Sequence, residues 1–190
     1  MVSIEDVGVP PSWRLGEFRL RPLRLSDAPA FHAYLSEPRV VEHTSFPELD
    51  LPAVEAMISR QLEGYAAATS RRWALADAND HLIGTCGFTS WSLPHAHAEL
   101  AYDLAPAFWG RGLMRAAAEQ VLSWAFDAAG FNRVHSFVMT SNGPSIGLLE
   151  RLGFQREGTL RQYRIARGVA RDFYVYARLQ AASQAPLRSL

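Results

Sequence analysis

The sequence predicts a single α/β domain in which helices cover the faces of a mixed β-sheet. Three observations support this prediction. Period-two runs typical of strands and 3.6-residue periods typical of helices follow one another in the order β, α, α, β, β, β, α, β, α, β, β. A hydrophobic content of 48% suits one large core in 190 residues. No internal repeat or linker divides the chain, so one domain should span residues 1–190, with a core of about 15–179 between a loose leader and a frayed tail.

The first half of the chain predicts a strand, two helices and a hairpin. Residues 18–25 alternate in polarity as a strand does. Two helices follow, because Ser26 or Asp27, and later Asp50, stand where N-caps are expected and apolar residues recur behind them at helical spacing. A proline ends the first of these helices. Residues 72–88 predict a β-hairpin with a polar Asn-Asp turn.

The second half predicts four more strands and two more helices. Residues 98–104 form a strand, and residues 114–129 form a long helix whose apolar stripe recurs every three or four residues. Gly130 is suited to end that helix in a left-handed conformation. A strand over 133–140 then leads to a short helix capped by Ser141 or Asn142. Two final strands, 158–165 and 172–179, complete the sheet.

Charge and cysteine content restrict the function. The 19 basic and 19 acidic residues give a formal net charge of +0, which argues against nucleic acid as an obligatory partner. Cys86 is the single cysteine, which excludes an intramolecular disulfide and fits a reducing compartment. The sequence carries no signal-peptide pattern, and no apolar run approaches the ~20 residues that span a bilayer. We therefore expect a cytoplasmic protein with no membrane partner.

The most informative motif joins the strand 98–104 to the long helix and reads Phe-Trp-Gly-Arg-Gly-Leu-Met over residues 108–114. The first N–H groups of a helix have no internal partner and the helix dipole is positive there, so a glycine-rich turn at this place favours a phosphate-bearing ligand. The motif lacks the Gly-Lys-Ser/Thr ending of a P-loop and the third glycine of a dinucleotide fingerprint. Taken alone, it is equally compatible with a strand-to-helix turn that binds nothing.

Together with its neighbours, this motif resembles the GNAT superfamily of acyl-CoA N-acyltransferases. The hallmark of that family is a Gln/Arg-x-x-Gly-x-Gly/Ala turn, against which Trp109 and Met114 are departures. The chain resembles most closely the Rim-type branch of ribosomal-protein N-terminal acetyltransferases. The pieces that carry this resemblance are 19–22 with 26–27, 83–84, 99–102, Asn142 with Ser145, 149–154 and 157–158. The resemblance implies a mostly antiparallel sheet with helices on both faces.

The resemblance also implies where acetyl-CoA binds. The turn would hold the pyrophosphate, and the pantetheine arm would pair with the strand 98–104, which brings the thioester near its end. The backbone N–H of Leu104 would then be the oxyanion donor. The expected cofactor-binding residues are Tyr102, Leu104, Trp109, Gly110, Arg111, Gly112, Leu113, Met114, Arg115, Asn142 and Ser145.

Acetyl transfer to an amine needs a base for the ammonium group and a donor for the leaving thiolate. Glu99 is the first candidate base, on the same strand face as Ala101 and Asp103, although it could equally be a hydrogen-bonded carboxylate without a catalytic role. His97 and His43 are weaker candidates. The tyrosine that serves many family members as the acid is replaced here by Leu149. Ser145 is therefore the candidate donor, with first-turn capping as its alternative.

The acceptor is the least determined part. By resemblance, the loop 37–50 and the turn 163–172 select it, with Glu42, His43, Trp91, Tyr163 and Arg164 as candidate lining residues. The His-Ala-His run at 95–97 lacks a third ligand at a diagnostic spacing, so no metal is expected. A protein N-terminal amine is the first expectation. A small amine (polyamine, amino acid or antibiotic) is the second, a non-catalytic acyl-CoA-binding module is the third, and a homodimer is expected from the family alone.

Overall fold

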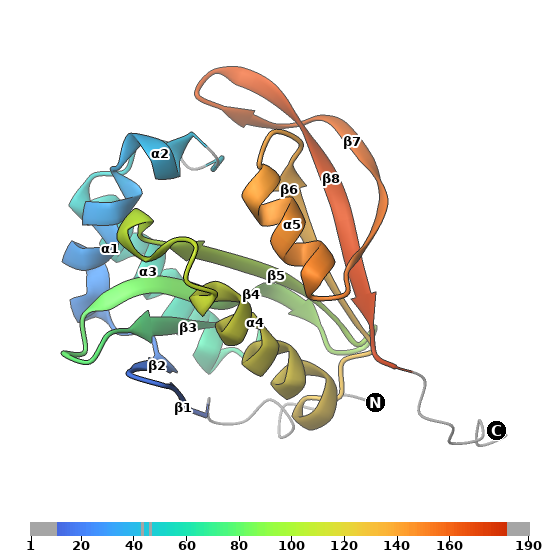
Figure 1. Ribbon diagram of the computed structural model, residues 1–190, viewed down its shortest axis with the longest axis horizontal. Coiled ribbons are helices and arrows are strands. Elements are labelled where there is room, and N and C mark those ends of the chain that lie inside the picture. Colours follow the sequence, from blue (N-terminus) through green and yellow to red (C-terminus); the bar gives the residue numbers. More distant parts are fainter. Residues whose placement is uncertain (1–10, 43, 46, 182–190) are drawn as a thin grey trace, which may run out of the picture.

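A computed structural model describes residues 11–42, 44–45 and 47–181. Its centre is a twisted eight-stranded sheet of order β1-β2-β3-β4-β5-β6-β8-β7, antiparallel throughout except between β5 and β6 (Figure 1). This confirms the mixed, mostly antiparallel sheet. The strands are β1 Trp13–Leu15, β2 Phe18–Pro22, β3 Arg71–Ala76, β4 Leu82–Ser92, β5 His97–Leu104, β6 Arg133–Met139, β7 Gln155–Ala166 and β8 Val169–Leu179.

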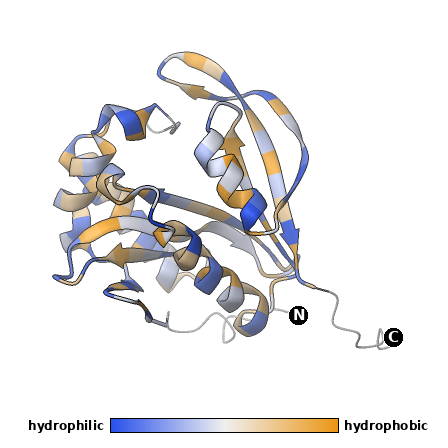
Figure 2. Ribbon diagram, in the orientation of Figure 1, coloured by the Kyte–Doolittle hydropathy of each residue, from blue (hydrophilic) through white to orange (hydrophobic). Residues whose placement is uncertain are grey.

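Helices cover both faces of the sheet, and each face has its own hydrophobic cluster. Trp73 and Leu75 on β3 point to one cluster and the intervening Ala74 points to the other, as expected for a strand buried on both sides. Along β8, hydrophobic and hydrophilic residues alternate from residue 172 to residue 179 (Figure 2). The helices are α1 Ala28–Leu35, α2 Pro38–Val41 and α3 Leu51–Ala66 on one side, and α4 Leu113–Ser123 and α5 Gly143–Arg151 on the other (Figure 1).

The parallel pair β5 and β6 separates along its length. Their pairing is confined to His97–Glu99 and Arg133–His135, although β5 continues to Leu104. Over the remaining length each strand keeps its antiparallel neighbour, β5 pairing with β4 and β6 with β8. Antiparallel pairing is slightly more stable per residue than parallel pairing. Where β5 and β6 diverge, the parallel pairing between them is therefore the one that is lost. The sheet therefore opens into a gap between β5 and β6.

Several boundaries differ from those predicted. Residues 13–15, expected in the loose leader, form β1 and pair with β2 around Gly16 at φ +66°. Pro38 does end α1, but it also starts α2, because proline suits the first turn of a helix. The second strand of the predicted hairpin, expected to end at residue 88, continues to Ser92 and so includes Trp91. The long helix continues past α4 as a π-helical turn at Trp124–Ala128, and Gly130 follows at φ +71° as predicted.

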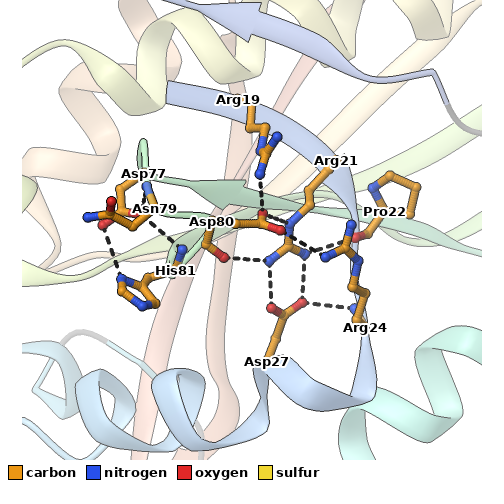
Figure 3. Close-up of polar contacts among 9 residues, drawn as sticks. All are labelled: Arg19, Arg21, Pro22, Arg24, Asp27, Asp77, Asn79, Asp80 and His81. Carbon is orange, nitrogen blue, oxygen red and sulfur yellow. Dashed lines mark hydrogen bonds and ion pairs between the residues drawn. The ribbon is translucent and has the colours of Figure 1, made fainter. Parts of the chain in front are cut away.

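A charged cluster fixes the start of α1 to the β3–β4 turn (Figure 3). Arg21, whose side chain is 5% exposed, donates to both carboxylate oxygens of Asp27 at 2.9 and 2.7 Å, and its Nε donates to Asp80 at 2.5 Å. Arg19 and Arg24 also pair with Asp80, each at 2.9 Å. Asp27 stands at the predicted N-cap of α1, but its side chain binds Arg21 instead of capping the helix. The hydrogen bond from Arg21 lowers the pKa of Asp80 to about 2.

Candidate active site

A cleft of about 490 Å³ occupies the gap between β5 and β6. Its walls come from both faces of the sheet, because residues of α3 and residues of α5 both line it. It therefore passes through the sheet. Among its lining residues are Glu99, Ala101 and Tyr102 from β5, Ser136 to Met139 from β6, Asn142 and Ser145 at the start of α5, Met57, Arg60 and Gln61 from α3, and Arg164 from β7.

A second cavity, of about 840 Å³, adjoins this cleft. The two share Pro47, Leu49 and Met139 as wall residues and therefore lie side by side, and together we call them the groove. Its other walls are the end of α1, α2 and the tip of the β7–β8 hairpin. Glu42, a predicted lining residue, is exposed and lines this second cavity. The predicted lining residue His43 lies outside the described residues.

The glycine turn lies between the end of β5 and α4. Gly110 and Gly112 have φ +74° and +73°, a left-handed conformation that glycine adopts without strain. A Cβ atom at either position would meet nothing within 4 Å, so both glycines are open to solvent. The first intrahelical bond runs from Ala116 to Gly112. The N–H groups of residues 113–115 thus have no partner within the helix and can receive an anion.

Trp109 fastens this turn to the end of β5. Its indole N–H donates to the carbonyl oxygen of Leu104 at 2.7 Å. The guanidinium group of Arg39, on α2, lies 5.7 Å from the centre of the indole ring. Arg39 is otherwise largely exposed, with Glu37 at 3.7 Å as its ion-pair partner. The turn is therefore flanked by an arginine that comes from a different part of the chain.

The other side chains of the turn differ in what they offer. Arg111 lies 5.2 Å over the Phe108 ring and is exposed. Arg115 donates to Glu119 at 2.9 Å, one helical turn later. Met114 is 7% exposed and packs in the core, so only its backbone can face a ligand. The two arginines therefore bring positive charge to the turn, although the contact with Glu119 partly neutralises the charge of Arg115.

The strand register determines the direction of the Leu104 N–H. Ala105 donates to Ile83 of β4 at 2.8 Å, and Leu104 is the register partner of Gly84. Successive residues of an antiparallel strand direct their backbone groups alternately to opposite sides. Leu104 and Tyr102 consequently direct their N–H groups away from β4, toward the side from which β6 has diverged.

Tyr102 and Ser145 meet across the cleft. The phenol oxygen lies 2.6 Å from the Ser145 Oγ and 3.3 Å from the Ser145 carbonyl oxygen. The backbone N–H of Ser145 donates to Asn142 Oδ1 at 3.1 Å, so Asn142 caps α5 and the Ser145 hydroxyl does not. Burial raises the pKa of Tyr102 well above its usual range. Leu149, in the next turn of α5, is fully buried in the core.

Glu99 lies in the cleft beside an arginine. Its Oε1 is 3.5 Å from Nη2 of Arg164, and the Glu99 side chain is 22% exposed. The guanidinium group of Arg164 in turn lies 5.2 Å from the Tyr163 ring and 5.6 Å from the Phe137 ring. The predicted lining residues Tyr163 and Arg164 therefore sit together on the Glu99 side of the groove. This carboxylate is accessible and has a cationic neighbour.

Asp103, expected on the same strand face, has a structural role. It is buried, accepts from the Tyr34 hydroxyl at 2.5 Å and from Thr85 Oγ1 at 2.8 Å, and forms an ion pair with Arg72. With these partners its carboxylate is fully occupied. Glu99 is thus the acidic group of β5 that remains available to a ligand.

Trp91, a predicted acceptor-lining residue, is not among the described residues that line the two cavities. Its indole N–H donates to the Ala68 carbonyl at 2.6 Å, and its ring packs 5.6 Å from Phe131 and 6.2 Å from Trp124. The side chain belongs to an aromatic cluster at the end of the sheet where β5 begins. β4 extends past the predicted end of its hairpin to Ser92, and this extension carries Trp91 into the cluster.

Two histidines, one on β5 and one on β6, lie in ring contact near the start of β5. The rings of His97 and His135 lie 5.5 Å apart. Burial, and then the neighbouring His97, lower the pKa of His135 to about 4. Within the described ranges, no three His, Cys, Asp or Glu side chains converge on a point where a metal could bind. The described helices are also too short or too polar for any of them to span a membrane.

Three groups that line or flank the site were not predicted. Arg39 contacts Trp109, and Arg167 at the hairpin tip donates to the carbonyl oxygens of Val41 and Glu42 at 2.5 and 3.2 Å. Gln61 on α3 lines the cleft, and its Oε1 is buried with no hydrogen-bond partner among the described residues. Each lies far along the chain from the residues it serves, so no local spacing could have indicated it.

Comparisons with known proteins agree with this geometry. A family model described as an acetyltransferase (GNAT) domain matches residues 17–155. The uncharacterized N-acetyltransferase p20 of Bacillus licheniformis is 34% identical over 166 residues, which cover 85% of this chain and 92% of that protein.

Solved structures share the fold. Ribosomal-protein-S5-alanine acetyltransferase from Vibrio fischeri superposes with a TM-score of 0.79 at 21% identity, over 90% of this chain and 97% of that chain. Spermidine N-acetyltransferase from Vibrio cholerae, solved with CoA and spermine, superposes with a TM-score of 0.76 at 22% identity, over 86% of this chain and 96% of that chain. The neighbours thus include enzymes for protein and for polyamine acceptors. Because the family model covers most of its length, the chain belongs to the GNAT acetyltransferase family.

Proposed function

We propose that this protein transfers the acetyl group of acetyl-CoA to the α-amine of a protein N-terminus. GNAT acetyltransferases use acetyl-CoA, so the acetyl donor follows from the family. The identity of the acceptor does not follow from the family and is the part that we propose. One observation carries this choice: the cleft beside Glu99 adjoins the cavity of about 840 Å³ and shares wall residues with it, which offers an extended acceptor room beyond its reacting amine.

The donor would bind along the turn and β5. The pyrophosphate would be received by the N–H groups of residues 113–115 and by the two open glycines, with Arg111 adding charge. The pantetheine arm would lie along the side of β5 that has lost β6, where the N–H groups of Tyr102 and Leu104 point. This arrangement brings the thioester carbonyl to the end of β5 and beside Ser145.

The chemistry would then proceed by direct attack. Glu99 accepts the proton of the incoming ammonium group, and the free amine attacks the thioester carbon. The Leu104 N–H stabilises the oxyanion that forms. The carbon–sulfur bond breaks, its electron pair goes to sulfur, and the Ser145 hydroxyl donates a hydrogen bond to the resulting thiolate. The nitrogen, which became positively charged on attack, releases its extra proton to solvent water and leaves the neutral amide.

The α3 wall of the cleft supports a peptide as the acceptor. The unpartnered Gln61 Oε1 is a buried hydrogen-bond acceptor, and such a group costs stability until it receives a donor. A peptide N–H next to the reacting amine would supply that donor. Arg60, exposed on the same helix and without an ion pair to any described residue, can meet a carbonyl or carboxylate of the same acceptor.

A polyamine is the second candidate, supported by a specific feature. Three carboxylates, Glu42, Glu48 and Glu99, are spaced along the groove, which suits a chain of ammonium groups. The solved relative with spermine shows that this fold can serve such an acceptor in that protein. The same groove is also lined by four arginines, at positions 60, 164, 167 and 171, whose positive charge repels a polyamine. For this reason we prefer the peptide as the acceptor.

Two measurements test the proposal. Acetyl-CoA should raise the melting temperature, since a ligand that binds only the native state stabilises it. Release of CoA should then be followed over a panel of N-terminal peptides, polyamines, amino acids and aminoglycosides. The chain contains no lysine, so self-acetylation of side chains adds no background. Turnover of peptides above all other amines is the expected result. Binding without turnover of any amine would identify a non-catalytic acyl-CoA-binding module instead.

A further inference from the structure

We propose that Tyr102 is a positioning residue, which orients the Ser145 hydroxyl toward the leaving sulfur. This inference rests on the proposed function, because it requires the thioester to lie in the cleft beside Ser145. It assigns a task to a phenol that comes from β5, on the opposite side of the cleft from α5.

The need for such a group follows from α5 itself. A thiolate leaving group is stabilised by a nearby hydrogen-bond donor. Leu149, one turn after Ser145, is fully buried and apolar, so it can supply none. Ser145 remains as the hydroxyl of α5 that lines the cleft. A serine hydroxyl rotates freely, and therefore it acts as a donor in one direction only when a neighbour holds it.

The contacts around Ser145 define two arrangements. In the first, the Tyr102 hydroxyl donates to Ser145 Oγ at 2.6 Å, and the serine proton is left to point into the cleft. In the second, the serine donates to the phenol, and the phenol donates to the Ser145 carbonyl at 3.3 Å. The second bond is the longer one, and it leaves no donor for the cleft. A thiolate in the cleft favours the first arrangement, because it gains a charge-assisted hydrogen bond there.

Burial keeps the phenol in the required state. The raised pKa of Tyr102 means that its hydroxyl stays protonated throughout the neutral and mildly alkaline range. It can therefore donate to Ser145 at every pH at which the enzyme works. Neither hydroxyl has to give up its proton during the reaction. The sulfur leaves as an anion that accepts the serine O–H. The first ammonium proton goes to Glu99, and the second, lost from the nitrogen after attack, goes to solvent water.

A double-mutant cycle tests this inference. Tyr102→Phe removes only the phenol oxygen, and Ser145→Ala removes the hydroxyl that it orients. We expect each variant to lower kcat about tenfold, in the range of one lost hydrogen bond to a charged group. The KM for acetyl-CoA should stay within about twofold. If Tyr102 acts through Ser145, the double variant should be no slower than Ser145→Ala alone.

Tyr174→Phe is the matched control. Tyr174 packs against the same core and its hydroxyl makes no hydrogen bond within the described part of the chain, so kcat should stay within about twofold.

Multiplicative losses in the double variant would overturn the inference, as would a Tyr102→Phe effect confined to KM. A loss of the alkaline limb of the pH–rate profile in Tyr102→Phe would overturn it too, because the phenol would then be the acid itself. A wild-type protein that turns over no amine overturns the proposed function and this inference together, whereas turnover with multiplicative losses overturns this inference alone.

Discussion

The indole N–H of Trp109 donates to the carbonyl oxygen of Leu104 at 2.7 Å, which joins the glycine turn to the last residue of β5. Leu104 directs its N–H to the open side of β5, where we propose that the oxyanion forms. One contact thus fixes the distance between the proposed phosphate site and the proposed oxyanion donor. The position at which the family hallmark has glutamine or arginine serves here to hold the turn in place.

The Trp109 contact predicts a binding defect when the N–H is removed. Trp109→Phe keeps an aromatic ring beside Arg39 but cannot donate to Leu104. One neutral hydrogen bond contributes about 0.5–1.5 kcal/mol, so the Kd for acetyl-CoA should rise by up to about tenfold. Isothermal titration measures this directly. An unchanged Kd, with the melting temperature also unchanged, would mean that the turn is held by other contacts.

Glu99→Gln should remove the proposed base while it leaves the donor site intact. The amide has nearly the same shape, so acetyl-CoA should bind as before. Proton abstraction contributes about 10²–10⁴-fold to such reactions, and kcat should fall within that range. The acidic limb of the pH–rate profile should disappear in the variant. A profile with the same acidic limb would show that Glu99 is not the base.

The order of the elements was predictable because each carries its own local pattern. The alternating strands 98–104 and 133–140 and the stripe of α4 depend only on near neighbours in sequence, and all are found. The short elements β1 and α2 were missed for a physical reason. Three- and four-residue segments are too short to show a period, and they form through contacts with other segments. β1 pairs with the adjacent β2, and the end of α2 is held by Arg167, more than 120 residues later.

The site was predictable only in its local part. The open glycines and the Asn142 cap follow from the chemistry of a few adjacent residues. The contact between Tyr102 and Ser145 joins residues 43 positions apart, and its geometry depends on how far β5 and β6 diverge. The packing of Trp91 was unpredictable for a similar reason, since the length of β4 decides that this side chain joins the aromatic cluster.

Asp80 predicts how stability changes in acid. Its pKa in the folded protein is about 2, against 3.8 for an unperturbed carboxyl, so the folded state favours the ionised form. The stability that Asp80 contributes is therefore complete above about pH 4 and is lost as the pH falls toward 2. The nearly buried Arg21 should carry most of it, because solvent screens the more exposed Arg19 and Arg24.

The measurement compares the free energy of unfolding of the wild type and Asp80→Asn across pH 2–6. The difference between them should be constant above pH 4 and should shrink below it. Asp77→Asn, in the same turn, is the control, because asparagine keeps the side-chain oxygen that accepts from the Asn79 and His81 N–H groups. If the difference in free energy of unfolding between the wild type and Asp80→Asn does not change with pH, the charge of Asp80 does not contribute to stability.

Arg167 holds α2 against the β7–β8 hairpin, and its removal should therefore affect the acceptor before the donor. The guanidinium group donates to the carbonyl oxygens of Val41, Glu42 and Thr44 at 2.5, 3.2 and 3.3 Å. The last carbonyls of a helix have no internal partners, and a cation there is favourable.

In Arg167→Ala, hydrogen exchange of amides near the end of α2 should accelerate and the KM for the acceptor should rise, while the Kd for acetyl-CoA stays the same. Arg161→Ala removes the same charge from an exposed position of β7 and should change neither quantity. Faster exchange at α2 with an unchanged acceptor KM would mean that this clamp supports the fold and that the acceptor does not use the second cavity.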